Sequence, residues 1–259
     1  MIRYDDHTFA ICAYGDSPYL EECIKSLKNQ TVKSDIILAT STPSEYINEI
    51  AEKYDIPVFE NPVKNGGIGE DWNFAVSSAK TNLVTVAHQD DVYLEKYLES
   101  ILHAFDPDKR QILFYTNYSE LIDGEVKENR RNLKVKRLIS LMFNNKLLGA
   151  KKWFKRRLLS IGSPIGCPAV TLQTNYTGSS PYITGYSFAL DWLTWEKLAR
   201  IDGEFSFVDE IMMFHRRHDE AATTKCIENN VRKKEDLEVL KRFWCKPIAL
   251  FIQKFFAKS

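Results

Sequence analysis

The sequence predicts an α/β fold built on a mostly parallel, doubly wound sheet, with a more helical C-terminal half. Short apolar segments alternate with longer amphipathic segments through the first half of the chain, as in proteins whose helices connect parallel strands. Polar clusters follow several apolar segments directly, at the strand ends where open α/β sheets bind ligands. The length of 259 residues, with 44% hydrophobic and 27% charged residues, is ordinary for a globular chain with a substantial core.

The elements of the first half follow in order from these patterns. Residues 8–13 are the first expected strand, and Ser17 and Pro18 suit the cap and first turn of the helix after it. A glycine-rich segment, 66–69, precedes a further helix. The other expected strands are 35–39, 57–59, 83–87 and 112–115, and the other expected helices are 44–54 and 94–105.

The second half of the sequence is less regular and more helical. Residues 133–159 have a helical pattern that we expect to break near Gly149. The remaining expected elements are a strand at 169–172, helices at 187–199 and 231–243, and an apolar-aromatic stretch at 248–256. No repeat or low-complexity linker separates the halves, so we expect one continuous domain with a nucleotide-sugar-binding part, 1–125, and an acceptor-binding part, 126–259.

The charge is zero overall but unevenly distributed along the chain. Residues 129–190 contain no Asp or Glu, while the bases of this stretch gather between Arg130 and Arg157 among many large apolar residues. Such a segment suits a helix on an anionic membrane surface, or one that holds the pyrophosphate of a lipid-linked acceptor. The structural alternative is a solvated basic helix packed on the core. The sequence contains no recognised RNA- or DNA-binding motif, so we expect no nucleic acid partner.

The cysteines and the hydropathy of the sequence predict its location. The five cysteines are odd in number and have no metal-binding spacing, as expected in a reducing compartment. The N-terminus is polar, and no apolar run has the length that spans a bilayer. We therefore expect a cytoplasmic protein, which the basic segment could bring to the inner face of the cell membrane.

The segment 83–91 is the most informative in the chain, because a buried-strand pattern ends there in His88, Gln89, Asp90 and Asp91. Adjacent carboxylates at a strand end repel each other unless a cation or hydrogen-bond donors compensate them. A divalent metal that binds a phosphate is the usual compensation at such an edge. The structural alternative is that Asp91 caps the following helix.

Five segments together resemble the family 2 glycosyltransferases, which have the Rossmann-like GT-A fold. The resemblance covers most of residues 9–224, and any one segment alone is weakly specific. Two departures stand out: His88 replaces the first acid of the metal motif, and the second strand ends at Thr40 and Ser41, where many relatives have an Asp that reads uracil. The segments are 9–31, 66–69 with Asn73, 88–91, 190–192 and 214–218.

The resemblance implies a role for each site residue. It makes Asp90 a ligand of Mn²⁺ or Mg²⁺, with His218 as a second ligand, and it makes Asp191 the base that takes the acceptor proton. Asn73 would reach the diphosphate or lock the glycine loop, and His88 would contact the ribose or the donor sugar. The other expected donor-binding residues are Ala13, Tyr14, Thr40, Gly67 and Arg217.

The function implied is transfer of a sugar, with inversion, from a nucleotide diphosphate sugar to a saccharide or lipid-linked saccharide in bacterial surface polysaccharide synthesis. The donor nucleotide stays open between UDP and dTDP. Two alternatives remain at this point. A nucleotidyltransferase would need a glycine-rich basic loop that residues 13–16 lack, and a non-catalytic membrane-associated scaffold would tolerate His88 in a degenerate site.

Overall fold

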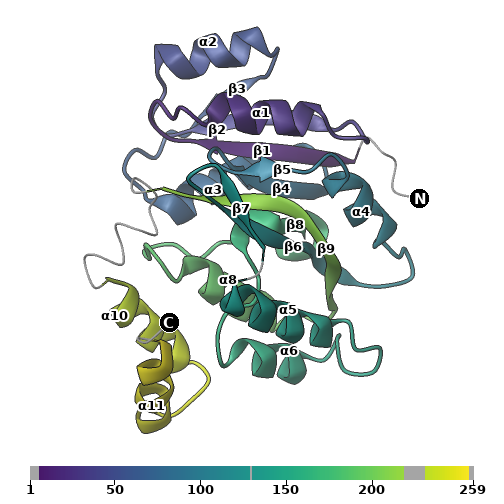
Figure 1. Cartoon of the computed structure of the whole chain (residues 1–259), viewed down its shortest axis with the longest axis vertical. Coiled ribbons are helices and arrows are strands. Elements are labelled where there is room, and N and C mark those ends of the chain that lie inside the picture. Colours follow the sequence, from purple (N-terminus) through teal and green to yellow (C-terminus); the bar gives the residue numbers. More distant parts are fainter. Residues whose placement is uncertain (1–5, 129, 219–230, 257–259) are drawn as a thin grey trace.

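The computed structural model describes residues 6–128, 130–218 and 231–256, and it has the predicted α/β architecture (Figure 1). A curved sheet runs through both halves of the chain, and its strands follow in the order β3 (Val58–Glu60), β2 (Asp35–Thr40), β1 (His7–Ala13), β4 (Leu83–His88), β8 (Val170–Gln173), β6 (Gln111–Ile122), β9 (Glu204–Arg217) and β5 (Val92–Tyr93). Alternate residues of β1 (His7–Ala13) face opposite layers: Phe9 and Ile11 pack with α1 (Leu20–Lys28) and α2 (Glu45–Lys53), and Ala10 packs with α3 (Ile68–Ser78). Helices therefore cover both faces, as a doubly wound sheet requires.

The first half forms as its periodicity predicts. The strands β1, β2 (Asp35–Thr40), β3 (Val58–Glu60) and β4 (Leu83–His88) are all parallel. Helix α2 is capped by Ser44, whose hydroxyl accepts from the Ile47 N–H at 3.2 Å. Helix α1 begins later than expected, with Tyr19 rather than Ser17 in the N-cap position. Because these strands are parallel, Ala13, Thr40 and His88 end at one edge of the sheet.

The second half contains strands that the sequence patterns did not predict. The expected strand at 112–115 extends to β6 (Gln111–Ile122), which pairs in parallel with the unpredicted β9 (Glu204–Arg217). Antiparallel β8 (Val170–Gln173) separates β6 from β4, so β6, β9 and β4 all run in one direction. The C-terminal end of β9 therefore reaches the same edge of the sheet as the C-terminal end of β4.

The remaining elements complete the two layers. The helical pattern at 133–159 is two helices, α5 (Arg131–Phe143) and α6 (Lys152–Leu159), as the expected break requires. Gly149 lies between them, where a Cβ atom would be 2.3 Å from the Phe143 carbonyl oxygen. The others are β5 (Val92–Tyr93), α4 (Tyr97–His103), β7 (Glu125–Lys127), the 3-10 helix η1 (Cys167–Ala169), α7 (Thr174–Thr177), α8 (Leu190–Leu198), α10 (Val231–Leu240) and α11 (Lys246–Phe256).

The longest and most apolar helices of the described segments fall short of a membrane span, since none has both the length and the hydropathy that crossing requires. The end of the expected resemblance, residues 219–224, lies outside the described residues, as does Cys226.

Candidate active site

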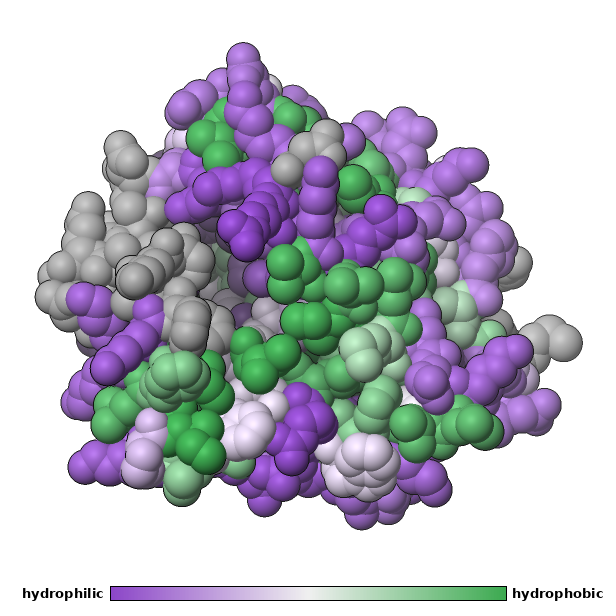
Figure 2. All heavy atoms as spheres, turned by 60° about the horizontal axis from the view of Figure 1, so that its bottom comes forward, coloured by the Kyte–Doolittle hydropathy of each residue, from purple (hydrophilic) through white to green (hydrophobic). Residues whose placement is uncertain are grey.

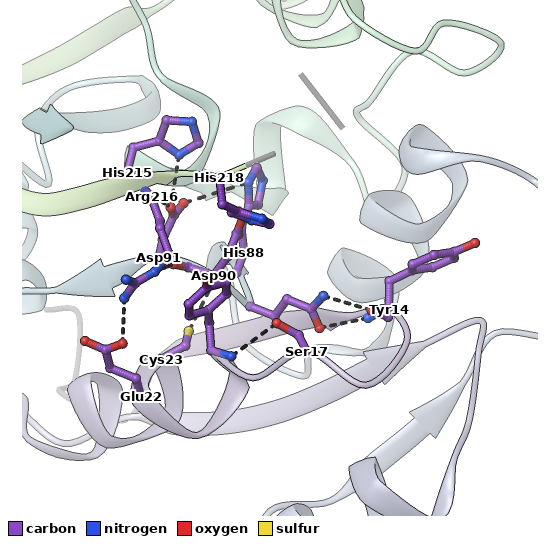
Figure 3. A network of polar contacts seen from close by, with 12 residues as sticks. Tyr14, Ser17, Glu22, Cys23, His88, Asp90, Asp91, His215, Arg216 and His218 are labelled. Atoms are coloured by element: carbon purple, nitrogen blue, oxygen red, sulfur yellow. Dashed lines mark hydrogen bonds and ion pairs between the residues drawn. The ribbon is translucent and has the colours of Figure 1, made fainter. Parts of the chain in front are cut away.

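Asp91 is fully buried and joins the end of β4 to the end of β9 (Figure 3). Its Oδ1 accepts hydrogen bonds from His215 Nδ1 at 3.0 Å and from the Arg216 backbone N–H at 2.9 Å. Burial alone would lower the pKa of His215, but the charge of Asp91 and the hydrogen bond to it outweigh burial, so this pKa is raised. The helix-cap alternative for Asp91 is wrong, because α4 begins at Tyr97 and has Lys96 in its N-cap position.

Asp90 turns away from this buried network toward His218. The Oδ2 atom of Asp90 lies 3.1 Å from Nε2 of His218, and the two side chains are 20% and 22% exposed. The fold therefore places together the two residues expected to bind a metal, although they are far apart in the sequence. A carboxylate oxygen and an imidazole nitrogen that solvent can reach are a donor set suited to Mn²⁺.

His88 extends this cluster, since one ligand atom from each of His88, Asp90 and Asp91 can lie within 4.8 Å of the others. The imidazole of His88 stacks on Trp72, with 4.9 Å between ring centroids and 23° between ring planes. Burial lowers its pKa to about 4, although the charge of Asp90 opposes this shift. Within the described structure, His88 Nε2 and Asp91 Oδ2 are buried without a hydrogen-bond partner. Neutral His88 is therefore a lone-pair donor or hydrogen-bonding group, and the cluster fits a cation.

Arg216 fixes the loop that carries Asp90. Its Nε donates to the Asp90 carbonyl oxygen at 2.8 Å, and its terminal nitrogen pairs with Glu22 at 2.5 Å. The guanidinium lies over the ring of Tyr19, 4.4 Å from its centroid, and that ring is 5.1 Å from the ring of His218. Arg216 thus ties α1, β4 and β9 together, a role that sequence reasoning missed because Glu22 is nearly two hundred positions away.

Arg217 points to a different partner from Arg216, as neighbouring residues of a strand do. Its guanidinium lies 3.8 Å from Glu120 on β6, and Glu120 also pairs with Arg130. The described partner of Arg217 is therefore Glu120, and its expected role in donor binding stays a prediction.

Tyr14 stands at the open end of β1 and is 65% exposed. The Gln89 side-chain amide accepts from the Tyr14 N–H and donates to the Tyr14 carbonyl oxygen, both at 2.9 Å (Figure 3). The motif loop thus holds the backbone of Tyr14 and leaves its ring open to a ligand. Ala13 is only 3% exposed, and the buried Thr40 hydroxyl accepts from the Thr42 N–H at 3.0 Å. Their expected roles in donor binding stay predictions.

Asp71 provides an acid at the end of β2 that the sequence reasoning overlooked. One carboxylate oxygen accepts from the Ser41 hydroxyl at 3.1 Å, and the other accepts from the Asn61 side-chain amide at 3.0 Å. Asp71 belongs to the first turn of α3, so the helix places a carboxylate beside the strand end where the expected Asp is missing. The only sequence signal was its closeness to the glycine segment.

Gly67 and Asn73 have structural partners in α3. Gly67 is the N-cap residue of α3 and has a φ of 93°, a conformation that favours glycine. The Asn73 amide donates to the Tyr182 carbonyl oxygen at 3.0 Å and accepts from the Tyr182 N–H at 2.8 Å. Asn73 is buried and locks α3 to the segment before α8, and its expected contact with the diphosphate stays a prediction.

Asp191 lies in the first turn of α8, and one of its oxygens accepts from the Trp192 N–H at 2.6 Å. Burial raises the pKa of Asp191 to about 6, and Asp236 adds to this, while the Trp192 N–H and the charge of Lys136 oppose it. Burial raises the pKa of the Cys167 thiol, and the charges of Asp191 and Asp91 add to this shift, so both carboxylates act on η1. An acid with a pKa near neutrality can exchange a proton with a bound hydroxyl group.

The fold and these residues define a GT-A type glycosyltransferase. A sequence model of glycosyl transferase family 2 matches residues 8–169, and the chain belongs to this family. Comparison with curated protein sequences gives no match.

Solved structures with the same fold include TarS 1-349 from S. aureus in complex with UDP-GlcNAc, at a TM-score of 0.64 and 15% identity over 97% of this chain and 71% of that one. Glucosyl-3-phosphoglycerate synthase from Mycobacterium tuberculosis, with Mn²⁺ and UDP-glucose, has a TM-score of 0.60 and 14% sequence identity. The match covers 92% of this chain and 79% of that one. Mannosyltransferase PcManGT from Pyrobaculum calidifontis, with GDP-Man and Mn²⁺, has a TM-score of 0.63 and 11% sequence identity. The match covers 92% of this chain and 63% of that one. At these identities the likeness establishes the fold alone.

Proposed function

We propose that this glycosyltransferase transfers a sugar, with inversion and with the help of a metal ion, from a nucleoside diphosphate sugar to a saccharide or lipid-linked saccharide hydroxyl. The contact between Asp90 and His218 at 3.1 Å is the observation that carries this proposal. It joins the motif after β4 to the residue after β9 at the edge of the sheet where α/β folds bind nucleotides.

Asp90 and His218 would hold Mn²⁺ or Mg²⁺, with His88 beside them. The ion, when bound, would neutralise charge on the diphosphate leaving group. Two of the solved structures with this fold contain Mn²⁺ together with UDP-glucose or GDP-Man, which supports a metal here. Arg216 and Asp91 would keep the loop in place through their contacts with Glu22 and His215.

Asp191 would act as the general base. The acceptor oxygen attacks the anomeric carbon, the bond from that carbon to the diphosphate oxygen breaks, and the hydroxyl proton passes to the Asp191 carboxylate. Attack from the face opposite the leaving group inverts the anomeric centre. The raised pKa of about 6 leaves the carboxylate deprotonated at neutral pH and basic enough to take the proton.

The donor base would bind between Tyr14 and Asp71. The exposed Tyr14 ring offers a stacking surface, and the Asp71 carboxylate can accept a hydrogen bond from a base that has a ring N–H. Uracil and thymine have such a group, whereas cytosine has an acceptor nitrogen in its place. Asp71 would therefore replace the acid missing after β2 and favour UDP- or dTDP-linked sugars.

The biological setting that we propose is bacterial surface polysaccharide synthesis at the cytoplasmic side of the membrane. The resemblance of the sequence motifs to family 2 supports it, together with the basic segment of the acceptor half.

Isothermal titration calorimetry with UDP, dTDP and CDP, each with and without Mn²⁺, tests the proposal. We expect UDP or dTDP to bind more tightly with Mn²⁺ than without it, and CDP to bind weakly. GDP is titrated as well, and failure of all four nucleoside diphosphates to bind in the presence of Mn²⁺ would rule out the proposed function.

A further inference from the structure

Helix α5 has apolar residues on two opposite sides, which is unusual for a helix at the surface of a protein. Phe143 faces inward and packs in the hydrophobic core, and Leu133 is buried as well. Val135, Leu138 and Met142 recur at positions i, i+3 and i+7 on the outer side, where they are 51%, 66% and 47% exposed. The inner side accounts for the fold of the helix, and the outer side is left without a structural explanation.

The apolar surface continues beyond α5. Leu147 in the connection to α6 is 83% exposed, and Trp153 on α6 and Ile161 after it are 61% and 53% exposed. Figure 2 shows this end of the molecule, where hydrophobic residues cover the middle and hydrophilic residues surround them. A contiguous apolar surface of this kind marks an interaction site rather than ordinary scatter.

Helix α11 adds apolar side chains at the same end of the molecule as α5 and α6 (Figure 1). Ile248 and Leu250 are 44% and 39% exposed there. The connection from α10 to α11 is fixed to α6, because the Trp244 indole donates to the Ser160 carbonyl oxygen at 2.8 Å and the Arg157 guanidinium lies over the Trp244 ring at 4.8 Å.

The basic side chains around this apolar surface determine which kind of partner can bind it. Arg131, Lys134, Lys146 and Lys151 are exposed around the apolar residues. None of the four forms an ion pair with an acid in the described ranges 6–128, 130–218 and 231–256. Acids from other segments pair with some basic residues of this stretch, since Asp209 contacts Arg137 and Asp202 contacts Lys152. Arg131, Lys134, Lys146 and Lys151 are therefore the residues that give this end its positive potential.

We propose that the outer face formed by α5, α6 and α11 binds the surface of an anionic lipid bilayer. Apolar side chains would enter the boundary between head groups and acyl chains, and the surrounding bases would contact anionic head groups. A symmetric contact with a second copy would bring like charges together, which disfavours it. The phosphates of a nucleic acid would pair with the basic side chains, but a nucleic acid would leave the apolar middle of the surface exposed.

This placement would serve the proposed function, on which this step of the inference rests. Lys136, on the inner side of α5, donates to the Tyr118 hydroxyl at 2.9 Å, and its charge acts on Asp191. One helix therefore connects the bilayer face to the acceptor side of the site. The saccharide of a lipid-linked acceptor would then reach Asp191 while its lipid carrier stays in the membrane.

Vesicle co-sedimentation of the full chain, without nucleotide or metal, tests the membrane proposal separately from the transfer reaction. We expect binding to phosphatidylcholine vesicles enriched in phosphatidylglycerol, weaker binding in high salt, and little binding to phosphatidylcholine alone. The double variant Leu138→Glu/Met142→Glu should bind about tenfold more weakly or worse. Val63→Glu, at a residue as exposed as Val135 but on the donor side, is the matched control and should bind as the unmodified chain does.

A second double variant, Arg131→Glu/Lys134→Glu, tests the contribution of the basic residues. It should weaken binding to anionic vesicles about twentyfold or more. Lys28→Glu/Lys80→Glu, at exposed bases elsewhere, should change it little. Circular dichroism confirms that each variant is folded. The proposal would be overturned if the chain bound neutral and anionic vesicles equally, or if Leu138→Glu/Met142→Glu and Arg131→Glu/Lys134→Glu both bound vesicles as the unmodified chain does. It would also be overturned if the chain bound no vesicles and instead formed a dimer that these two variants dissociate.

Discussion

The donor edge of the sheet and the acceptor side of the site hold their carboxylates in different ways. At the donor edge, two hydrogen bonds from β9 hold one oxygen of Asp91, and Asp90 lies on a loop that Arg216 fixes to α1. On the acceptor side, the hydrogen bond to Asp191 comes from its own helix, and burial raises its pKa to about 6. Contacts between separate elements thus hold the first region in place, whereas the raised pKa of Asp191 suits the proton exchange that we propose for the second.

We expect the largest loss of transfer activity from Asp90→Ala. This substitution tests whether the donor edge serves metal and nucleotide binding rather than the stability of the fold. Removing the proposed metal ligand should lower transfer about a thousandfold or more and abolish the Mn²⁺-dependent gain in nucleotide binding. Because Asp90 is partly exposed, the unfolding midpoint should change little. Transfer assays, calorimetry and thermal unfolding measure the three properties.

The control for Asp90→Ala is Asp108→Ala, an exposed acid just before β6 at the opposite edge of the sheet. It should leave nucleotide binding unchanged. Full transfer activity in Asp90→Ala would remove Asp90 from the metal site.

Asp191→Asn is the corresponding change on the acceptor side. An amide cannot take the acceptor proton, so the transfer rate should fall about a thousandfold while nucleotide binding stays as it was. In the unmodified chain, the rate should decrease about tenfold per pH unit below pH 6, because the pKa of about 6 leaves Asp191 protonated there. Lys136 and Cys167 lie nearby with raised pKa values, so neither changes its charge in this range. Asp236, whose pKa burial raises to about 6, titrates in the same range as Asp191.

A pH–rate profile with saturating donor checks this second prediction. Asp236→Asn is a useful comparison, since removing a nearby acid should move the acid limb of the profile to lower pH while activity at neutral pH is kept. Unaltered turnover in Asp191→Asn would exclude Asp191 as the base.

Asp91→Asn tests the fixed geometry of the donor edge by its stability. The substitution removes a buried charge that His215 and the Arg216 N–H both contact, and it should cost about 2 kcal/mol. For a chain of this size, that lowers the unfolding midpoint by roughly 4 to 8 °C. Thermal unfolding measures the shift, and a midpoint unchanged from the original would show that the network around Asp91 is not stabilising.

The sequence predicted the first half of the fold, and it predicted that Asp90 and Asp91 follow the fourth strand directly, because both depend on local patterns. Apolar periodicity identifies β1, β2, β4 and their helices, and the acids after β4 stand out within one segment. The length of β6 and the presence of β9 depend on their pairing with each other across a long stretch of sequence. For the same reason, only the fold could show that Arg216 binds Glu22, that Asn73 binds Tyr182 and that Asp71 reaches Ser41.

Asp71→Asn has the smallest expected effect and tests whether the donor edge also selects the base. A carboxylate only accepts hydrogen bonds, so it favours the ring N–H of uracil or thymine over the acceptor nitrogen of cytosine. Asparagine offers both a donor and an acceptor, so the preference for UDP over CDP should narrow by about tenfold, the worth of one hydrogen bond. Competition calorimetry measures the ratio, and Glu70→Gln, the neighbouring acid in the first turn of α3, is the control. If Asp71 only ties β2 to α3 through Ser41, the substitution will lower the unfolding midpoint and leave this ratio as it was, which places base selection elsewhere at the sheet edge.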